Sequence, residues 1–306
     1  MEKNPQDALI SSRIRGLGGW SGDEFSPLPE AGWLPLSPII DLKRIRNNAI
    51  LSSMPPSTSY ANRFQACDDV ESYDLKVYGA GSYSSRIWEL QRPVLAEFLR
   101  HYQREVRHPL TLLDFACGTG RVLASLEPLV AAADGIDISP AMIAVARTKC
   151  RQARLQVGDI LTQPELLGKN YDVITAFRFL LNVEPEIRRR ALQRLREVIQ
   201  EPHGRLVVNV HGNSRSLRHP AILWRRWRER AQPTGAMLNE MSPGETRRLL
   251  RESGFQVVRQ FGFGLLPPTL YRTPLRHLAG TLDKTLAGDG WCRNWAIDQL
   301  FVCRPV

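Results

Sequence analysis

The chain has 306 residues, of which 43% are hydrophobic and 24% are charged, the composition of an ordinary globular protein with one large domain or two small ones. Its net charge of +10 comes from 35 Arg and 6 Lys against 31 acidic residues, and residues 178–230 alone carry 13 basic and 5 acidic side chains. This concentration excludes a polybasic tail and a uniformly basic surface.

The cysteines and the lack of long apolar runs set the expected compartment. The five cysteines form no Cys-x-x-Cys pair, and an odd number does not suggest a disulfide framework or a cysteine-based zinc site. No signal-peptide core follows the first residues, and no apolar run approaches the roughly 18 residues that a spanning helix needs. We expect a cytoplasmic protein with no metal site and no integral membrane segment.

The N-terminal part differs in composition from the rest of the chain. Residues 1–60 hold seven Pro, five Gly and nine Ser, which is poor material for regular elements. We expect an irregular extension over 1–70 and one domain over 71–306. Apolar residues at helical spacing predict that this domain opens with a helix over 83–102.

Apolar and amphipathic segments then alternate along the chain. The predicted strands are 111–117, 134–138, 154–158, 171–177, 205–210, 255–262 and 295–303. The predicted helices between them are 119–130, 140–152, 185–200 and a capped helix from Ser242 to near Gly254. This alternation indicates an α/β fold, a doubly wound, seven-stranded and mostly parallel sheet with helices on both faces. Insertions at about 213–238 and 265–290 are expected to cap it.

The most informative stretch follows the strand at 111–117 and reads Asp-Phe-Ala-Cys-Gly-Thr-Gly over 114–120. A buried strand that enters a Gly-x-Gly turn and then a helix lets the backbone approach a ligand closely. A dinucleotide-binding loop needs a third glycine where Leu123 stands, and a P-loop needs Lys and Ser or Thr after Gly120, where Arg121 and Val122 stand. Both nucleotide-binding interpretations are therefore weakened.

This stretch resembles the glycine loop of the class I S-adenosylmethionine-dependent methyltransferases of small-molecule type, with a Rossmann-like sheet. Ala116 stands where the family usually has its first glycine, a small change that should not prevent binding. The resemblance continues in Asp137, which ends the next strand where the family binds the ribose, in Gly158-Asp159-Ile160 near the adenine, and in the strand that ends at Phe177. Four motifs in the right order make S-adenosylmethionine the expected cofactor.

The resemblance implies a set of cofactor-binding residues, with Asp114 near the ammonium group and Tyr83 closing over the cofactor. The set is Tyr83, Asp114, Ala116, Gly118, Gly120, Asp137, Ile138, Met142, Asp159, Ile160 and Phe177. Cys117 lies in the loop without a His or Asp arrangement around it, so we interpret it as a buried small residue. Asp172 starts a strand, and we interpret it as structural.

Candidate acceptor residues lie directly after the fourth and fifth strands. Arg178 suits a carboxylate or phosphate, or else a salt bridge at a helix start, and Asn182 follows it. Asn209 and His211 end the fifth strand at the edge where open α/β sheets bind ligands. His211 is the candidate general base, and the alternative is a structural histidine.

The Arg/Trp-rich segment has three explanations. Ile222, Leu223, Trp224 and Trp227 beside several arginines make an amphipathic helix for a membrane surface or a lipid-like acceptor. Alternatively the arginines attract an anionic small molecule, with Trp224 in the substrate site. The third explanation is a solvated helix face.

The sequence therefore predicts methyl transfer to a small molecule, anionic or hydrophobic and from secondary metabolism, with no nucleic acid partner. The stretch after Phe177 lacks the Asp/Asn-Pro-Pro-aromatic motif of base methyltransferases. Two alternatives stay open. One is an RNA methyltransferase, suggested by the pI of 9.7. The other is a non-catalytic binding module that keeps the fold, against which the intact loop residues argue.

Overall fold

The structure, a computed structural model, describes residues 79, 81–168, 170–231, 240–267, 270–271, 273–274 and 276–306. The chain divides into two compact units, Met1–Ser57 and Thr58–Val306. The expected boundary near residue 70 and the irregular extension before it lie outside the described residues, so both stay predictions. The elements below all belong to the second unit.

Seven strands of the described residues form one sheet, in the order β3-β2-β1-β4-β5-β7-β6. They are β1 (Thr111–Phe115), β2 (Ala132–Asp137), β3 (Arg154–Val157), β4 (Val173–Ala176), β5 (Arg205–Val210), β6 (Phe255–Phe263) and β7 (Asp298–Pro305). The first five pair in parallel, while β7 runs antiparallel to both β5 and β6. The expected mostly parallel, seven-stranded α/β sheet is confirmed.

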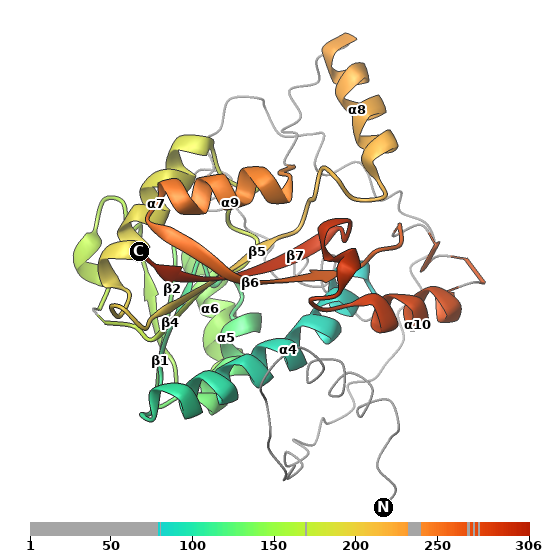
Figure 1. Ribbon diagram of the computed structural model, residues 1–306. Coiled ribbons are helices and arrows are strands. Elements are labelled where there is room, and N and C mark those ends of the chain that lie inside the picture. The colour runs from blue at the N-terminus through green and yellow to red at the C-terminus, as the bar shows by residue number, and fades with distance from the viewer. Residues whose placement is uncertain are drawn as a thin grey trace, which may run out of the picture. The chain divides into compact units, whose positions relative to one another are not determined.

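Helices cover both faces of this sheet (Figure 1). One face carries α4 (Tyr83–Val106), α5 (Arg121–Leu126) and α6 (Pro140–Lys149), and the other carries α7 (Pro185–Val198) and α9 (Pro243–Glu252). Two further helices, α8 (His219–Ala231) and α10 (Arg276–Leu286), belong to the two expected insertions. Short 3-10 turns are η1 (Glu127–Leu129), η2 (Pro164–Leu166) and η4 (Trp291–Asn294).

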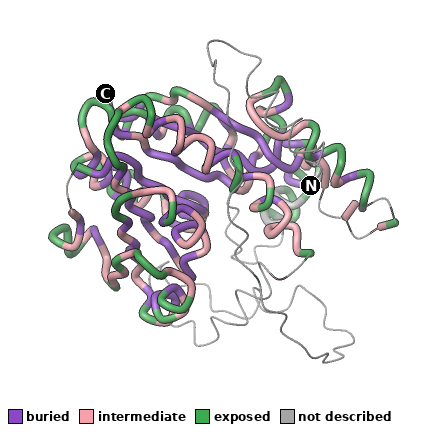
Figure 2. Tube along the Cα trace, turned by 90° about the horizontal axis from the view of Figure 1, so that it is seen from below, coloured by how far each residue is buried: buried purple, intermediate pink, exposed green. Residues whose placement is uncertain are grey.

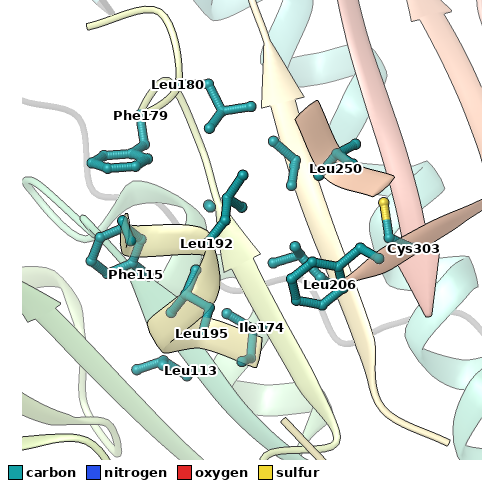
Figure 3. Close-up of a cluster of buried hydrophobic side chains, with 14 of the residues drawn as sticks. Leu113, Phe115, Ile174, Phe179, Leu180, Leu192, Leu195, Leu206, Leu250 and Cys303 are labelled. Atoms are coloured by element: carbon teal, nitrogen blue, oxygen red, sulfur yellow. The ribbon is translucent and has the colours of Figure 1, made fainter. Parts of the chain in front are cut away.

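The core is two apolar layers, one on each face of the sheet, and Figure 2 shows the buried residues running through its centre. On the α7 and α9 face, Leu192, Leu195 and Leu250 pack against strand residues such as Leu206 and Cys303 (Figure 3). On the other face the apolar side of α4, which includes Leu95 and Leu99, packs against the sheet. Burial of these side chains on both faces holds the strands in register.

Most predicted boundaries hold within a few residues. The capping box of α9 is present, because Ser242 Oγ accepts from the N–H of Glu245 and Glu245 Oε2 accepts from the N–H of Ser242. The helix expected over 119–130 is shorter, since its first residues belong to the glycine loop. It ends at Leu126, because the 3-10 turn η1 begins at Glu127 and contains Pro128. The helix α10 was not predicted, because Gly280 and two threonines weaken its helical pattern.

The parallel strands β1, β2, β4 and β5 all end at one side of the sheet, which we call the carboxyl edge. The connections that follow them meet there. Because β7 is antiparallel, its first residues lie at the same edge, where Gln299 pairs with Val210 and Asp298 pairs with Phe263 of β6. Ligands of open α/β sheets bind at such an edge.

Candidate active site

The loop between β1 and α5 turns sharply through three left-handed residues. Ala116, Gly118 and Gly120 have φ angles of 54°, 54° and 74°. Glycine adopts this conformation without steric cost, whereas an L-residue such as alanine pays about 1 kcal/mol or more. The usual glycine of the family at position 116 is thus explained by the backbone, and alanine occupies the same conformation here.

Gly118 and Gly120 serve different purposes within this loop. A Cβ on Gly118 would meet no atom within 4 Å, so its backbone faces open space. A Cβ on Gly120 would lie 2.9 Å from the Cβ of Ala146 and 3.0 Å from the Sγ of Cys150. Gly120 therefore permits α6 to pack closely against the start of α5, and Gly118 leaves the cavity open.

Asp137, at the end of β2, fixes the loop from the neighbouring strand. Its Oδ2 accepts a 2.9 Å hydrogen bond from the N–H of Gly118, and its Oδ1 accepts one of 2.9 Å from the N–H of Ser139. Burial raises the pKa of this carboxyl, and these N–H groups oppose the rise. A carboxylate has about four acceptor positions, so each oxygen keeps one for a ligand hydroxyl.

Asp114 is the buried acidic group of the site. Its side chain extends from β1, and its Oδ1 accepts a 2.6 Å hydrogen bond from the hydroxyl of Thr175 on β4. Its Oδ2 is buried and has no hydrogen-bond partner among the described residues. Burial raises the pKa of Asp114 to about 7, partly opposed by the Thr175 hydrogen bond and by the positive charge of Arg121. A cationic donor in the cavity would satisfy this oxygen.

A first cavity opens over the glycine loop. Its lining comes from β1, the loop, the end of β2, the start of α6 and the connection after β4: Asp114, Ala116, Cys117, Gly118, Thr119, Arg121, Val122, Asp137, Met142, Phe177, Arg178, Phe179 and Asn182. Arg178 holds the left-handed conformation at φ 55°, and the side-chain amide of Asn182 donates to its carbonyl at 2.5 Å. Asn182 thus stabilises the turn that places Arg178 at the cavity.

A second cavity, the acceptor chamber, shares Arg121 and Arg178 with the first. Its lining comes from α4, the end of β5, the residue before α8 and the start of β7: Tyr83, Ser84, Ile87, Gln91, Arg121, Arg178, Asn209, His211, Arg218, Ile297 and Asp298. Arg121 stacks over the ring of Trp88, with its guanidinium carbon 4.5 Å from the ring centroid. Because two arginines line both cavities, the chamber adjoins the glycine loop.

The floor of the chamber is a buried polar network. Asp298 Oδ1 accepts hydrogen bonds from the side-chain amides of Gln91 on α4, at 2.6 Å, and Asn209 on β5. Burial raises the pKa of Asp298 to about 6, opposed by these bonds and by Arg178. Of the two arginines whose charge favours the ionised carboxylate, Arg178 contributes more than Arg121.

Nδ1 of His211 and the hydroxyl of Tyr83 are buried polar atoms of the chamber lining. Neither atom has a hydrogen-bond partner among the described residues. Burial lowers the pKa of His211 well below its ordinary value, and the charge of Arg178 lowers it further, so the imidazole is neutral near pH 7. Burial raises the pKa of Tyr83, with Asp298 adding to the effect. Both groups can exchange hydrogen bonds with a bound molecule.

Comparison with known proteins decides the family. The sequence model of a family described as a methyltransferase domain matches residues 87–260, more than half of the chain. The chain belongs to the class I S-adenosylmethionine-dependent methyltransferases. The match spans α4 to β6 and so includes the glycine loop, Asp137 and the strand before Arg178. No curated protein matches the chain.

Solved structures share the fold of this methyltransferase at low identity. The magnesium protoporphyrin IX methyltransferase (ChlM) from Synechocystis PCC 6803 with bound SAH is 15% identical, with a TM-score of 0.55 over 81% of this chain and 100% of that chain. The mitomycin 7-O-methyltransferase MmcR is 16% identical, with a TM-score of 0.50 over 81% of this chain and 61% of that chain. These likenesses show the shared fold.

The first cavity of the methyltransferase fits S-adenosylmethionine, its cofactor. The cofactor carries an ammonium group, for which the buried and unsatisfied Oδ2 of Asp114 is a suitable acceptor. Asp137 keeps acceptor capacity for hydroxyls, and Gly118 leaves room for close approach. No group of three or more His, Cys, Asp or Glu side chains among the described residues could hold a metal ion.

The structure brings most residues predicted for this site together, and it leaves others outside the cavities. Asp114, Ala116, Gly118, Asp137, Met142, Phe177, Arg178 and Asn182 line the first cavity, and Tyr83, Arg178 and His211 line the second. Gly120, Ile138, Asp159, Ile160 and Trp224 line neither. Asp159 Oδ1 accepts from the N–H of Leu161, Ile160 is buried, and Trp224 is exposed on α8. Their ligand contacts stay predictions.

Several lining residues were missed in the sequence, and three of them left a signal there. Gln91 is a polar residue at an apolar helical position four residues after Ile87, and Asp298 is a charge inside an apolar strand pattern. Arg121 directly follows the second loop glycine.

Asp172, interpreted as structural, accepts from both the N–H and the hydroxyl of Thr111, each at 2.8 Å, which ties β4 to β1.

Proposed function

We propose that this methyltransferase acts on a small molecule that carries an anionic group and binds in the acceptor chamber. The observation that carries the proposal is that Arg121 and Arg178 line both cavities. An acceptor in the chamber therefore lies beside the cofactor cavity. The cofactor supplies a methyl group on a sulfonium centre, and transfer depends mainly on holding the acceptor atom in line with it.

The charge of the chamber favours an anion. The chamber is lined by three arginines, Arg121, Arg178 and Arg218, and by one carboxyl, Asp298. The side-chain amides of Gln91 and Asn209 already donate to Oδ1 of Asp298. Guanidinium groups bind carboxylates and phosphates through paired hydrogen bonds. Stacking on Trp88 orders the Arg121 guanidinium, which lowers the entropy lost when it clamps a ligand.

His211 is proposed to take the proton of an acceptor hydroxyl. A neutral imidazole with an unpartnered Nδ1 inside the chamber can accept that proton, and burial beside Arg178 keeps it neutral at physiological pH. Tyr83, from α4, is proposed to orient the acceptor through its hydroxyl and to close the chamber from the helix side. Asp114 and Asp137 are proposed to hold the ammonium and ribose groups of the cofactor.

The experiment measures transfer of the labelled methyl group from S-adenosylmethionine to a panel of small hydroxylated carboxylates and phosphate esters. The neutral amides of the carboxylates and RNA serve as comparison acceptors. We expect label in anionic small molecules, and we expect Arg178→Gln and Arg218→Gln each to raise KM about tenfold with a smaller change in kcat. Arg228→Gln on α8, which lines neither cavity, is the matched control. Label found only in RNA or only in neutral acceptors would contradict the proposal.

A further inference from the structure

Large apolar side chains are exposed mainly at one end of the described structure. Eight of them belong to the two segments that flank the carboxyl edge, the one that follows β5 and the one between β6 and β7: Leu217, Leu223, Trp224, Trp227, Leu278, Leu282, Trp291 and Trp295. The acceptor chamber opens at the same edge, and Arg218 of its lining immediately precedes α8. Exposed tryptophans and leucines concentrated in two segments mark a candidate interaction site.

The helix α8 stands clear of the two helical layers (Figure 1) and presents an apolar stripe. Leu223, Trp224 and Trp227 lie within about 100° of one another at helical spacing, and Trp227 is 65% exposed. Ile222, on the other side of the helix, is buried. Trp224 and Trp227 therefore point away from the side of α8 that Ile222 buries, and they are not part of the protein core.

Basic side chains border this apolar stripe. The Arg228 guanidinium carbon lies 4.9 Å from the Trp224 ring centroid, and Arg230 lies on the other border beside Leu223. The helix sequence holds four arginines and one glutamate. An apolar centre of Leu and Trp with arginines along it is the pattern of a helix that lies in the interface of an anionic membrane.

A second apolar group lies between β6 and β7. Trp291 and Trp295 form an edge-to-face pair with ring centroids 5.6 Å apart, and Trp291 is 77% exposed. Leu278 and Leu282, four residues apart on α10, are exposed on the same side of that helix. Tryptophan is enriched at the level of lipid headgroups, and exposed leucines gain free energy only in an apolar medium.

We propose that α8 docks this methyltransferase on an anionic phospholipid membrane, with the Trp291 and Trp295 pair as a second contact. The arginines supply attraction to the headgroups, and Leu223, Trp224 and Trp227 insert at the interface. Aliphatic leucines beside the tryptophans favour a bilayer over RNA, which would use the aromatic rings and arginines alone. None of the described helices is long and apolar enough to cross a membrane, so the contact is peripheral.

The test is co-sedimentation of the full chain with vesicles of phosphatidylcholine alone or of phosphatidylcholine with phosphatidylglycerol. We expect binding to the anionic vesicles, weakened by salt. The double variant Trp224→Ser/Trp227→Ser should weaken it at least about tenfold, and Arg228→Gln/Arg230→Gln about fivefold for each charge removed. The matched control is Arg189→Gln/Arg194→Gln, which removes two exposed arginines from α7.

A second measurement separates insertion from charge attraction alone. Vesicles with brominated acyl chains should quench the tryptophan fluorescence of the wild type, and Trp224→Phe/Trp227→Phe should reduce the quenching. Circular dichroism checks that the variants fold. The proposal is overturned if the wild type does not bind anionic vesicles or binds neutral ones equally well. It is also overturned if the same variants abolish self-association or RNA binding and leave vesicle binding unchanged.

Discussion

The hydroxyl of Thr175 on β4 donates a 2.6 Å hydrogen bond to Oδ1 of Asp114 on the adjacent strand β1. This bond fixes one oxygen of a buried carboxyl and leaves the other, Oδ2, without a hydrogen-bond partner among the described residues. Desolvation without full compensation raises the pKa of Asp114 to about 7. The carboxyl is therefore prepared for a cationic ligand, and its protonation state should respond to that ligand.

Cofactor affinity should depend on pH through Asp114. The ammonium group of a bound ligand favours the carboxylate, so binding lowers the pKa of Asp114 below its value of about 7. At a pH below 7, binding therefore releases a proton from Asp114. We expect the Kd for S-adenosylhomocysteine to rise up to about tenfold for each pH unit below 7. Calorimetry across this range measures it. Asp114→Asn should bind about 10- to 100-fold more weakly at pH 8 and should lose this dependence.

The same carboxyl should affect stability in the opposite direction. The pKa of Asp114 in the folded protein, about 7, lies above the value of about 3.9 expected when unfolded. The native state therefore binds more protons between these values, and stability falls as pH rises from about 4 to about 7. The thermal unfolding temperature of the ligand-free protein should fall more steeply with rising pH in the wild type than in Asp114→Asn. An equal dependence on pH in the two proteins would contradict the raised pKa of Asp114.

Gly264 should be required for the position of Tyr83. It has φ +68°, and a Cβ there would clash with the Tyr83 hydroxyl and lie 2.6 Å from Cδ1 of Ile87. We expect Gly264→Ala to lower the free energy of unfolding by about 2–4 kcal/mol, measured by denaturant unfolding. Gly280→Ala is the control, because its Cβ would meet nothing within 4 Å in α10 and should add about 0.5–1 kcal/mol. Equal stabilities would contradict the packing.

The protonation of His211 can be followed directly by NMR. Its pKa should lie well below the ordinary value of about 6.5, because burial and Arg178 disfavour the imidazolium. Arg178→Gln should raise this pKa, but not to the ordinary value, since burial is the larger cause. The neutral histidine contributes stability that is lost as pH falls through about 6.5, where the unfolded chain takes up a proton. An ordinary pKa for His211 would contradict its burial beside Arg178.

Much of the fold could be predicted because its apolar periods are strong. The run over 205–210 became β5 with the same bounds, and Ser242 and Glu245 formed the capping box that their spacing indicated. The order of the strands could not be predicted. Apolar residues such as Val207 and Phe301 indicate that their strands are buried, but they do not indicate which strands lie next to each other. The helix α10 was missed, since Gly280 and two threonines weaken the helical pattern of its sequence.

The cofactor side of the site was more predictable than the acceptor side. Asp114, Gly118 and Asp137 lie in a contiguous motif whose backbone conformation demands specific residue types. The acceptor chamber assembles Gln91, Asn209 and Asp298 from segments far apart in the sequence, and only the fold brings them together. In the sequence, each of these contacts is visible only as one polar residue inside an apolar helix or strand pattern.

The role of the glycine loop is tested most directly by calorimetric titration of S-adenosylhomocysteine into the wild type and Asp137→Ala. Asp137 receives the N–H of Gly118 on one oxygen and that of Ser139 on the other, so its removal loosens the loop and deletes the proposed ribose contact. We expect one site per chain in the wild type and binding at least about 100-fold weaker in the variant. Absence of binding to the wild type, or equal affinity in the variant, would contradict the account.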